Sequence, residues 1–281
     1  MEIVRTAADT KARLRPLQRE GIRVGLVPTM GALHDGHLSL VRQMAPDVEV
    51  VVASIFVNPM QFGPKEDLAK YPRDLEGDAK KLASAGCHVV YAPDVADVYP
   101  PGFQTAVDVA DVTQGLCGAS RPGHFRGVTT VVMKLFVVVR PDVAIFGEKD
   151  FQQLTVLRRM AKDLALDVEI RGGPLVRDPD GLAMSSRNAY LSVEDRARAL
   201  TLSKGLGAAR DAYGRGERDG PRLIAIARAA LESVAITPEY LELRSYSDLV
   251  PLDRADGPCV ILVAARVGTT RLLDNVILSR P

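Results

Sequence analysis

The sequence predicts an α/β protein with a large parallel-sheet domain at its N-terminal end and a smaller α+β domain after it. In the first part, short runs rich in valine and isoleucine alternate with longer segments of helical periodicity. That alternation is typical of a parallel sheet covered by helices. In the last part, two helical segments precede three strand-like runs, a grouping that favours a separate α+β domain.

Buried strands and helices are expected to alternate along the first domain. The strands are predicted at Ile22–Val27, Val48–Val57, His88–Ala92, Val143–Phe146 and Val168–Ile170. The helices are predicted at His37–Ala45, Glu66–Ala85, Val128–Val139 and Phe151–Leu164. Parallel sheets bind ligands at the carboxyl ends of their strands. We therefore expect the loops after Val27, Val57 and Phe146 to form one site.

A change in amino-acid composition marks the expected domain boundary. Proline and glycine concentrate in Arg171–Gly181, which is typical of a boundary or hinge. We place the larger domain at residues 1–175 and the smaller domain at 176–281. Its predicted helices are Val193–Gly214 and Pro221–Val234, and its predicted strands are Tyr240–Arg244, Cys259–Val267 and Thr270–Val276.

Composition excludes several classes of protein. The formal net charge is only +1, so the chain lacks the large basic surface of a nucleic-acid-binding protein. Its three cysteines are widely spaced and form no CxxC pair, which argues against a disulfide framework and indicates a cytoplasmic location. The mixed, charged N-terminus is unlike a signal peptide. No apolar run reaches the ~18 residues of a membrane span.

The segment PTMGALHDGH, which ends at His37, follows the first strong strand. His34 and His37 stand about one helical turn apart if the helix has begun. A helix N-terminus offers amide donors and partial positive charge, so the motif is a candidate cradle for nucleotide phosphates. The sequence contains neither a P-loop nor a complete GxGxxG after this strand. Simple helix capping by the histidines is the alternative, and zinc binding is disfavoured because the cysteine and histidine spacings are wrong.

Two further motifs carry charge or hydroxyls. GEKDFQQ, at 147–153, brings Lys149 to the end of a strand, where an ammonium can balance charge on a transferring phosphoryl group; an exposed helix start is the alternative. Gln152 and Gln153 point in different directions on a helix, so we expect only one to enter a site. MSSR, at 184–187, offers two hydroxyls and a guanidinium to phosphate oxygens, although serine also starts helices and turns.

A polar segment, FVNPMQFG at 56–63, follows the second strong strand. Asn58 and Gln61 lie among apolar residues, a mixture that suits a small hydroxy-acid pocket. Asn58 serves equally well as a turn residue before a proline. The glycine- and arginine-bearing loop RPGHFRGV, at 121–128, is expected before a helix. Its His124 is either part of a site wall or a satisfied structural histidine.

The ordered set PTMGALHDGH, FVNPMQFG, YPRD, GHFRGV, GEKDFQQL and RDPDGLAMSSRN resembles the pantoate–β-alanine ligase family. The likeness is strongest between residues 20 and 195. HxGH with a later MSSR also resembles the wider nucleotidyltransferase superfamily. The resemblance implies a Rossmann-like first domain, a C-terminal lid domain and a homodimer. Asp35 and Val137 depart mildly from the family pattern, which leaves the reaction class unchanged.

The resemblance also implies roles for individual residues. The ATP contacts would be Met30, Gly31, Ala32, Leu33, His34, Asp35, Gly36, His37, Gly147, Glu148, Lys149, Asp150, Val176, Met184, Ser185, Ser186 and Arg187. Gln61 and Gln153 would bind pantoate. The catalytic set would be His34, His37, Lys149, Ser185, Ser186 and Arg187. The motifs do not predict which protein residues, if any, bind the Mg²⁺ ion that the resemblance also implies.

The activity implied is ATP- and Mg²⁺-dependent condensation of pantoate with β-alanine through a pantoyl-adenylate. Mg²⁺ is expected to bind mainly through phosphate oxygens and water. A nucleotidyltransferase acting on a phosphate-bearing small molecule is the enzymatic alternative, and it would need cations for the second phosphate. An ATP-binding protein without chemistry is the other alternative, and intact motifs argue against it. We expect no nucleic-acid or membrane partner.

Overall fold

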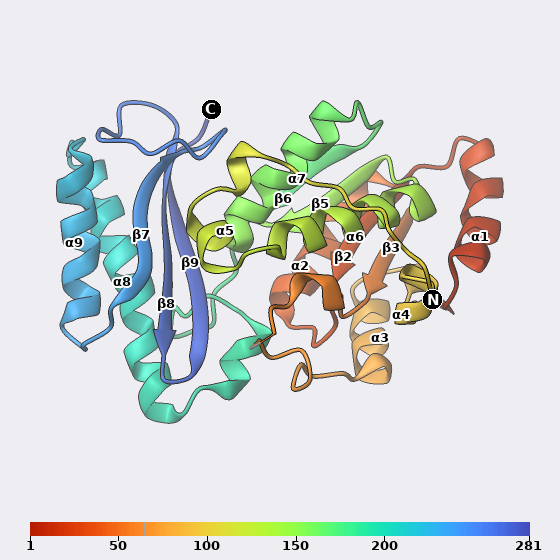
Figure 1. The fold of residues 1–281 in the computed structure, drawn as a ribbon, viewed down its shortest axis with the longest axis horizontal. Coiled ribbons are helices and arrows are strands. Elements are labelled where there is room, and N and C mark those ends of the chain that lie inside the picture. Colours follow the sequence, from red (N-terminus) through yellow and green to blue (C-terminus); the bar gives the residue numbers. More distant parts are fainter. Residues whose placement is uncertain (65) are drawn as a thin grey trace. The chain divides into compact units, whose positions relative to one another are not determined.

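The computed structural model describes residues 1–64 and 66–281, and the chain forms two compact units (Figure 1). The first unit comprises Met1–Thr113, Arg121–Glu148 and Val156–Pro174. The second comprises Gln114–Ser120, Lys149–Thr155 and Leu175–Pro281. The long C-terminal segment of the second unit thus begins beside the boundary expected between 175 and 176. Two short segments from earlier in the chain also belong to this unit.

The first unit is built on a six-stranded sheet in which every pairing is parallel. Its strands are β1 (Glu2–Val4), β2 (Val24–Thr29), β3 (Val50–Ile55), β4 (Val89–Tyr91), β5 (Val143–Gly147) and β6 (Glu169–Gly173), and their order is β1-β4-β3-β2-β5-β6. The chain moves one way from β2 to β3 and β4, and the other way from β5 to β6. This reversal makes the space between β2 and β5 the switch point at which such sheets bind ligands. The predicted fold class is confirmed.

Helices cover both faces of this sheet. They are α1 (Ala7–Arg19), α2 (Asp35–Met44), α3 (Leu75–Ser84), α4 (Val95–Val98), α6 (His124–Val139) and α7 (Phe151–Asp163), the last shared with the second unit, and 3₁₀ turns occur at Ala45–Asp47, Pro59–Gln61 (η2), Asp111–Thr113 and Glu148–Asp150 (η4). Leu38 and Val41 of α2 and Leu82 of α3 pack with Val27 and Val51 in one core cluster. Neighbouring strand residues such as Leu26 and Val52 are fully buried and point to the opposite face. No helix in the described part of the chain is both long enough and apolar enough to cross a membrane.

Two N-terminal elements, β1 and α1, were not predicted. β1 is a three-residue edge strand paired with β4. α1 contains Pro16, which weakens a helical signal. Tertiary hydrogen bonds support it: the Arg15 guanidinium donates to the carbonyls of Val137, Val138 and Val139, and Gln18 Nε2 donates to those of Val139 and Arg140. These carbonyls end α6, so α1 caps that helix.

Two helix boundaries differ from their predictions. The helix expected at Glu66–Ala85 covers only Leu75–Ser84, and it begins where the Asp74 side chain accepts a hydrogen bond from Gly77 N. The helix expected from Val128 begins at His124, after Gly123 at φ +81°. Most of the loop expected at Arg121–Val128 is therefore the first turns of α6.

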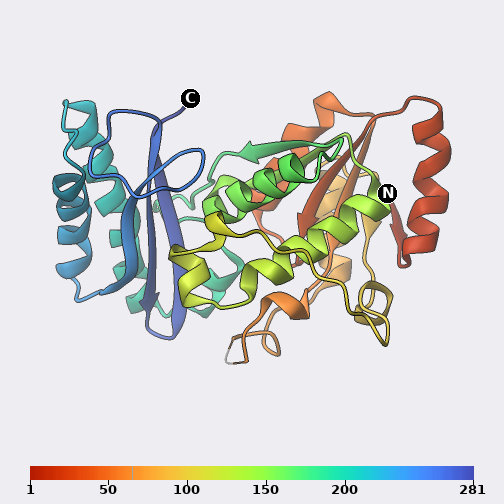
Figure 2. The same cartoon turned by 45° about the horizontal axis from the view of Figure 1, so that its top comes forward.

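The second unit contains an antiparallel sheet, β7 (Pro238–Ser245), β8 (Cys259–Val267) and β9 (Thr270–Ser279). Helices α8 (Val193–Gly214) and α9 (Gly220–Glu232) lie together against one face (Figure 2). On the other face, Val260 and Leu262 pack with Leu116 of α5 (Leu116–Ser120) and with Phe151. β8 is therefore buried on both faces over most of its length, which explains the apolar run Cys259–Ala265 that precedes the exposed Arg266.

Helix α6 passes very close to η2, and a glycine permits it. A Cβ on Gly127 would lie 2.3 Å from the Met60 carbonyl oxygen and 2.7 Å from Gln61 N. Both of those atoms are backbone atoms, so a side chain at 127 cannot be accommodated by rotating a neighbour. The contact fixes where the segment Asn58–Gln61 lies.

Gly127→Ala is expected to lower the free energy of unfolding by about 1–3 kcal/mol, as overpacking does. Gly207→Ala, in α8, is the matched control because nothing lies within 4 Å of a Cβ there. It should be neutral or stabilising by up to ~1 kcal/mol. Urea denaturation measures both. Equal stability of the two variants would contradict the close approach of α6 and η2.

Candidate active site

The candidate residues of the first unit follow three adjacent strands. β2 lies between β3 and β5, and all three are parallel. The loop from Met30 to His34 follows β2, the segment Phe56–Gln61 follows β3, and Glu148 follows β5. The structure therefore brings these segments to the carboxyl edge of the sheet beside the strand-order reversal, as the sequence predicted.

His34 and His37 are neighbours at the start of α2. Their ring centroids lie 4.1 Å apart, which confirms that they are one turn apart. His34 is the N-cap residue, and its backbone N–H donates to His37 Nδ1 at 3.4 Å. Because Nδ1 accepts, the proton of a neutral His37 ring resides on Nε2. Nε2 is thus the donor atom of a neutral His37 ring, and a donor is the form that suits a phosphate oxygen.

A buried carboxylate holds the loop before these histidines. Gly31 and Ala32 both have left-handed backbone, with φ of +80° and +51°, and the second is strained because alanine carries a Cβ. Asp78 of α3 is 1% exposed. Its carboxylate accepts from Ala32 N at 2.7 Å and from Leu33 N at 2.8 Å. These two amides are therefore engaged within the protein.

Lys81 completes this support from the same helix. Its ammonium donates to the Leu33 carbonyl at 2.8 Å and lies 3.7 Å from Asp78 Oδ1. The loop is thus held at two amides and one carbonyl, so α3 fixes the approach to α2.

The Gln61 side chain is oriented by Asn58, which is 1% exposed. Asn58 Oδ1 accepts from Met60 N at 3.2 Å and from the Tyr99 hydroxyl at 2.8 Å. Asn58 Nδ2 donates to Gln61 Oε1 at 3.0 Å and to the Gly127 carbonyl at 3.1 Å. Asn58 is therefore a turn residue, as one alternative expected, and it is also the partner of Gln61. Its place in a substrate pocket stays a prediction.

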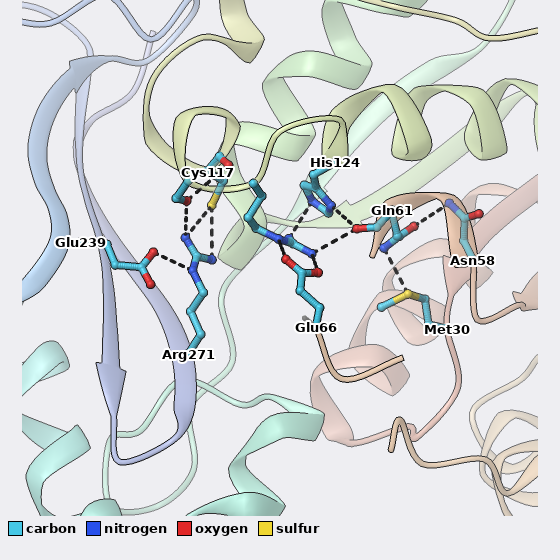
Figure 3. A network of polar contacts seen from close by, with 10 residues as sticks. Met30, Asn58, Gln61, Glu66, Cys117, His124, Glu239 and Arg271 are labelled. Atoms are coloured by element: carbon cyan, nitrogen blue, oxygen red, sulfur yellow. Dashed lines mark hydrogen bonds and ion pairs between the residues drawn. The ribbon is translucent and has the colours of Figure 1, made fainter. Parts of the chain in front are cut away.

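The backbone of Gln61 is held from the opposite side (Figure 3). His124 Nδ1 lies 2.9 Å from the Gln61 carbonyl oxygen, and His124 Nε2 lies 2.9 Å from Arg121. A guanidinium can only donate, so Nε2 accepts and Nδ1 carries the proton. His124 is 8% exposed, and it is a satisfied structural histidine that positions Gln61.

Glu66 anchors this arrangement through a two-pronged contact with Arg121. Both hydrogen bonds measure 2.7 Å. Burial raises the pKa of the Glu66 carboxyl, but the hydrogen bonds and charge of Arg121 oppose it, and the net pKa lies below the ordinary value. The carboxylate is therefore ionised at neutral pH, and Arg121 stays directed at His124 and Gln61.

In the second unit, Lys149 lies in η4, two residues after β5 ends. Its ammonium lies 3.9 Å from Asp150 Oδ2, and Asn275 of β9 donates to its carbonyl oxygen at 3.0 Å. Gln152 is buried, and its amide bonds to Cys117 N and to the Gly115 carbonyl. Gln153 is half-buried. The two glutamines thus differ in burial, and the expectation that only one of them enters a site stays a prediction.

The segment around MSSR forms a tied loop. Met184 N donates to the Val176 carbonyl at 3.0 Å, so two predicted nucleotide contacts are direct neighbours. Ser185 caps the 3₁₀ turn η5 (Ser186–Tyr190) by accepting from Arg187 N. Arg177 forms a two-pronged ion pair with the buried Asp274 at 2.7 and 2.9 Å. Ser185 thus starts a turn, as the alternative interpretation expected, and its role toward a ligand stays a prediction.

Metal ligands remain unassigned. Across residues 1–64 and 66–281, no three His, Cys, Asp or Glu side chains come together as a metal-binding group. Cys87, Cys117 and Cys259 are buried thiols without a disulfide.

The whole chain matches one family. A family model described as pantoate-beta-alanine ligase matches residues 2–277. The chain belongs to the pantoate–β-alanine ligase family. Pantothenate synthetase of Myxococcus xanthus is 56% identical over 277 residues, with 98% of this chain and 95% of the relative covered. The Rhodospirillum rubrum protein of the same name is 54% identical over 281 residues, covering 98% of each.

Solved structures of the family share the fold. Pantothenate synthetase from Thermus thermophilus superposes with a TM-score of 0.95 at 45% identity, and both chains are covered completely. The Francisella tularensis pantoate-beta-alanine ligase gives a TM-score of 0.81 at 31% identity, covering 99% of this chain and 98% of that one. That structure is a complex with beta-gamma ATP and beta-alanine. The resemblance predicted from the six motifs is confirmed.

Sequence reasoning missed several residues that support the pantoate–β-alanine ligase motifs. Asp78 lies 46 positions from Ala32, which it binds, and Tyr99 lies 41 positions from Asn58. Arg121 lies 60 positions from Gln61. Glu66 lies only 5 positions from Gln61 but stabilises it indirectly, through Arg121. Asp78 reads as an ordinary charged helix position. Arg121 stands within a noted motif but was not assigned. Their roles depend on tertiary hydrogen bonds that no local pattern encodes.

Asp78→Asn is expected to destabilise the chain by about 2–3 kcal/mol, because the new NH₂ group would face a backbone N–H and leave it unpaired. Amide hydrogen exchange at Ala32 and Leu33 should also accelerate. Asp74→Asn, on the same helix, is the control because asparagine caps helices as well as aspartate does. Unchanged exchange at Ala32 and Leu33 in Asp78→Asn would rule out the clamp.

Proposed function

We propose that this chain is an AMP-forming ligase that condenses (R)-pantoate with β-alanine, using ATP, to give pantothenate. The family match over residues 2–277 carries this proposal. The ATP- and β-alanine-bound structure of the Francisella tularensis relative supports the same substrates. The product is vitamin B5, a precursor of coenzyme A, as the family resemblance implies.

The reaction proceeds in two steps. A carboxylate oxygen of pantoate attacks the α-phosphorus of ATP, and pyrophosphate leaves with the electrons of the broken phosphoanhydride bond. The amine of β-alanine then attacks the acyl carbon of pantoyl-adenylate, loses a proton, and releases AMP. The carboxylate is already nucleophilic, so the first step needs positioning and charge stabilisation rather than a base.

In this proposal, the first unit supplies hydrogen-bond donors for both ATP and pantoate. We assign His34 and His37 to phosphate oxygens, and the Nε2 proton of His37 supports that role. Met30, Gly31, Ala32, Leu33, Asp35 and Gly36 complete the nucleotide contacts of this loop, with Ala32 and Leu33 contributing surface rather than amide donors. Gln61 is assigned to pantoate because its side chain is held rigidly at the carboxyl edge of the sheet.

The second unit supplies cations and hydroxyls. Lys149, Ser185, Ser186 and Arg187 are assigned to charge that develops on the phosphates, and Gln153 to pantoate. Gly147, Glu148, Asp150, Val176 and Met184 are the remaining proposed nucleotide contacts. Mg²⁺ would be held mainly by phosphate oxygens of ATP and by water, which are ligands it favours, and it would supply charge neutralisation at the phosphates. We also propose a cytoplasmic homodimer, on the family resemblance.

Pyrophosphate and AMP release from Mg-ATP tests the function directly. Pyrophosphate should appear only when pantoate is present, and steady AMP production should require β-alanine as well. Activity only with a phosphorylated acceptor would instead identify a nucleotidyltransferase. ATP binding without release of either product would identify a protein that has lost the chemistry.

Lys149→Ala and His37→Ala are each expected to fold normally and to lose about 10²–10³ in the rate of pyrophosphate release, because each removes one donor to the transition state. Lys162→Ala, in the last turn of α7, is the control and should retain full activity. Rapid-quench measurement of the first turnover isolates adenylation from amide formation. Near-normal adenylation in either variant would remove that residue from the proposed set.

A further inference from the structure

The orientation of the Asn58 side chain is dictated by backbone groups. Its Oδ1 faces the Met60 N–H, and its Nδ2 faces the Gly127 carbonyl. A flipped amide would set donor against donor at Met60 and acceptor against acceptor at Gly127. Neither backbone group can rotate, and Asn58 is buried, so the observed orientation is the one that satisfies every partner.

This orientation fixes the polarity of Gln61. Asn58 Nδ2 can only donate, so Gln61 must turn its Oε1 toward it, as the 3.0 Å contact shows. The Gln61 Nε2 group then points the other way, where it lies 3.1 Å from Met30 Sδ. Sulfur is a weak acceptor, and Nε2 carries two protons. Gln61 therefore offers a donor to an oxygen acceptor, and it offers no acceptor in that direction.

Tyr99 closes the chain of hydrogen bonds at its far end. Its hydroxyl lies 2.8 Å from Asn58 Oδ1, an atom that only accepts. Burial raises the pKa of the Tyr99 phenol above its ordinary value, so the proton needed for donation is retained. Its ring packs between Phe56, at 6.1 Å, and Phe103, at 5.1 Å between centroids. The hydroxyl is thereby held at a fixed point in the first unit.

We infer that Tyr99 is a positioning residue for the hydroxy-acid substrate: its hydroxyl holds Asn58, which holds the Gln61 amide with nitrogen toward the substrate. This inference rests on the proposed function and extends it. The group that pantoate presents to Gln61 is an oxygen acceptor, either a carboxylate oxygen or the lone pair of a hydroxyl. Tyr99 touches no reacting atom and acts through Asn58 and Gln61.

Tyr99→Phe tests the relay because it removes one hydroxyl and keeps the ring. The KM for pantoate should rise about 3- to 10-fold, the equivalent of one neutral hydrogen bond, while the KM values for ATP and β-alanine stay within twofold. Tyr91→Phe is the matched control, since Tyr91 is a buried phenol whose hydroxyl donates to Asp97 at 2.9 Å instead. It should leave all three KM values unchanged.

Three results would overturn the relay while the wild-type chain remains active with pantoate. These are an unchanged pantoate KM in Tyr99→Phe, a rise shared equally by all substrates, and the same rise in Tyr91→Phe. A wild-type chain that releases no pyrophosphate with pantoate would instead overturn the proposed function, and the inference with it. The two failures are therefore distinguished by the wild-type assay.

A second pair of variants tests the donor polarity without relying on Tyr99. Gln61→Ala removes the donor, whereas Gln61→Glu replaces it with an acceptor that repels a carboxylate. The kcat/KM for pantoate should be at least ~5-fold lower in Gln61→Glu than in Gln61→Ala, the equivalent of a like-charge contact at about 4 Å even with the full screening of bulk water. Equal or higher kcat/KM in Gln61→Glu would mean that Gln61 does not act as a donor to pantoate.

Discussion

Parallel pairing of β3, β2 and β5 constrains the first unit more than any other feature. The three strands end at one edge, and the strand order reverses between β2 and β5. The connections that follow β2 and β5 leave this edge in opposite directions along the sheet, which keeps the space beside the reversal clear of crossover connections. Loops from distant parts of the sequence therefore meet there, whatever side chains they carry.

Buried polar groups then convert that general position into a specific geometry. Asp78 engages two backbone amides of the loop after β2, and Asn58 uses all four of its hydrogen-bonding capacities around the segment after β3. A buried donor or acceptor left unpaired costs about 1–3 kcal/mol. Each alternative conformation of these loops would leave several such groups unpaired. The loops are therefore held by the cost of breaking these hydrogen bonds and not by apolar packing alone.

The second unit reaches rigidity by a different route. Its sheet has only three strands, but β8 is covered by α8 and α9 on one face and by the segments 114–120 and 149–155 on the other. The segment that carries Lys149 is thus part of this unit's core, because Phe151 and Asn275 anchor it to the sheet. Arg177 and Asp274 fix the loop before MSSR in a comparable way. The GEKDFQQ and MSSR segments of this unit are therefore anchored to its packed sheet.

The sequence by itself determined the class of fold, the positions of the strong strands along the chain and the motifs that identify the family. Those features are local: valine-rich runs, helical periodicity and the order of HxGH, GEKDFQQ and MSSR need no knowledge of distant contacts. Only the tertiary structure decided what Asp78, Tyr99 and His124 do, and that α1 forms despite Pro16. Each of these outcomes depends on a hydrogen bond to a backbone group or side chain far along the chain, where burial makes the partner obligatory. Local patterns record which residues are present, but they do not record which buried groups must satisfy one another.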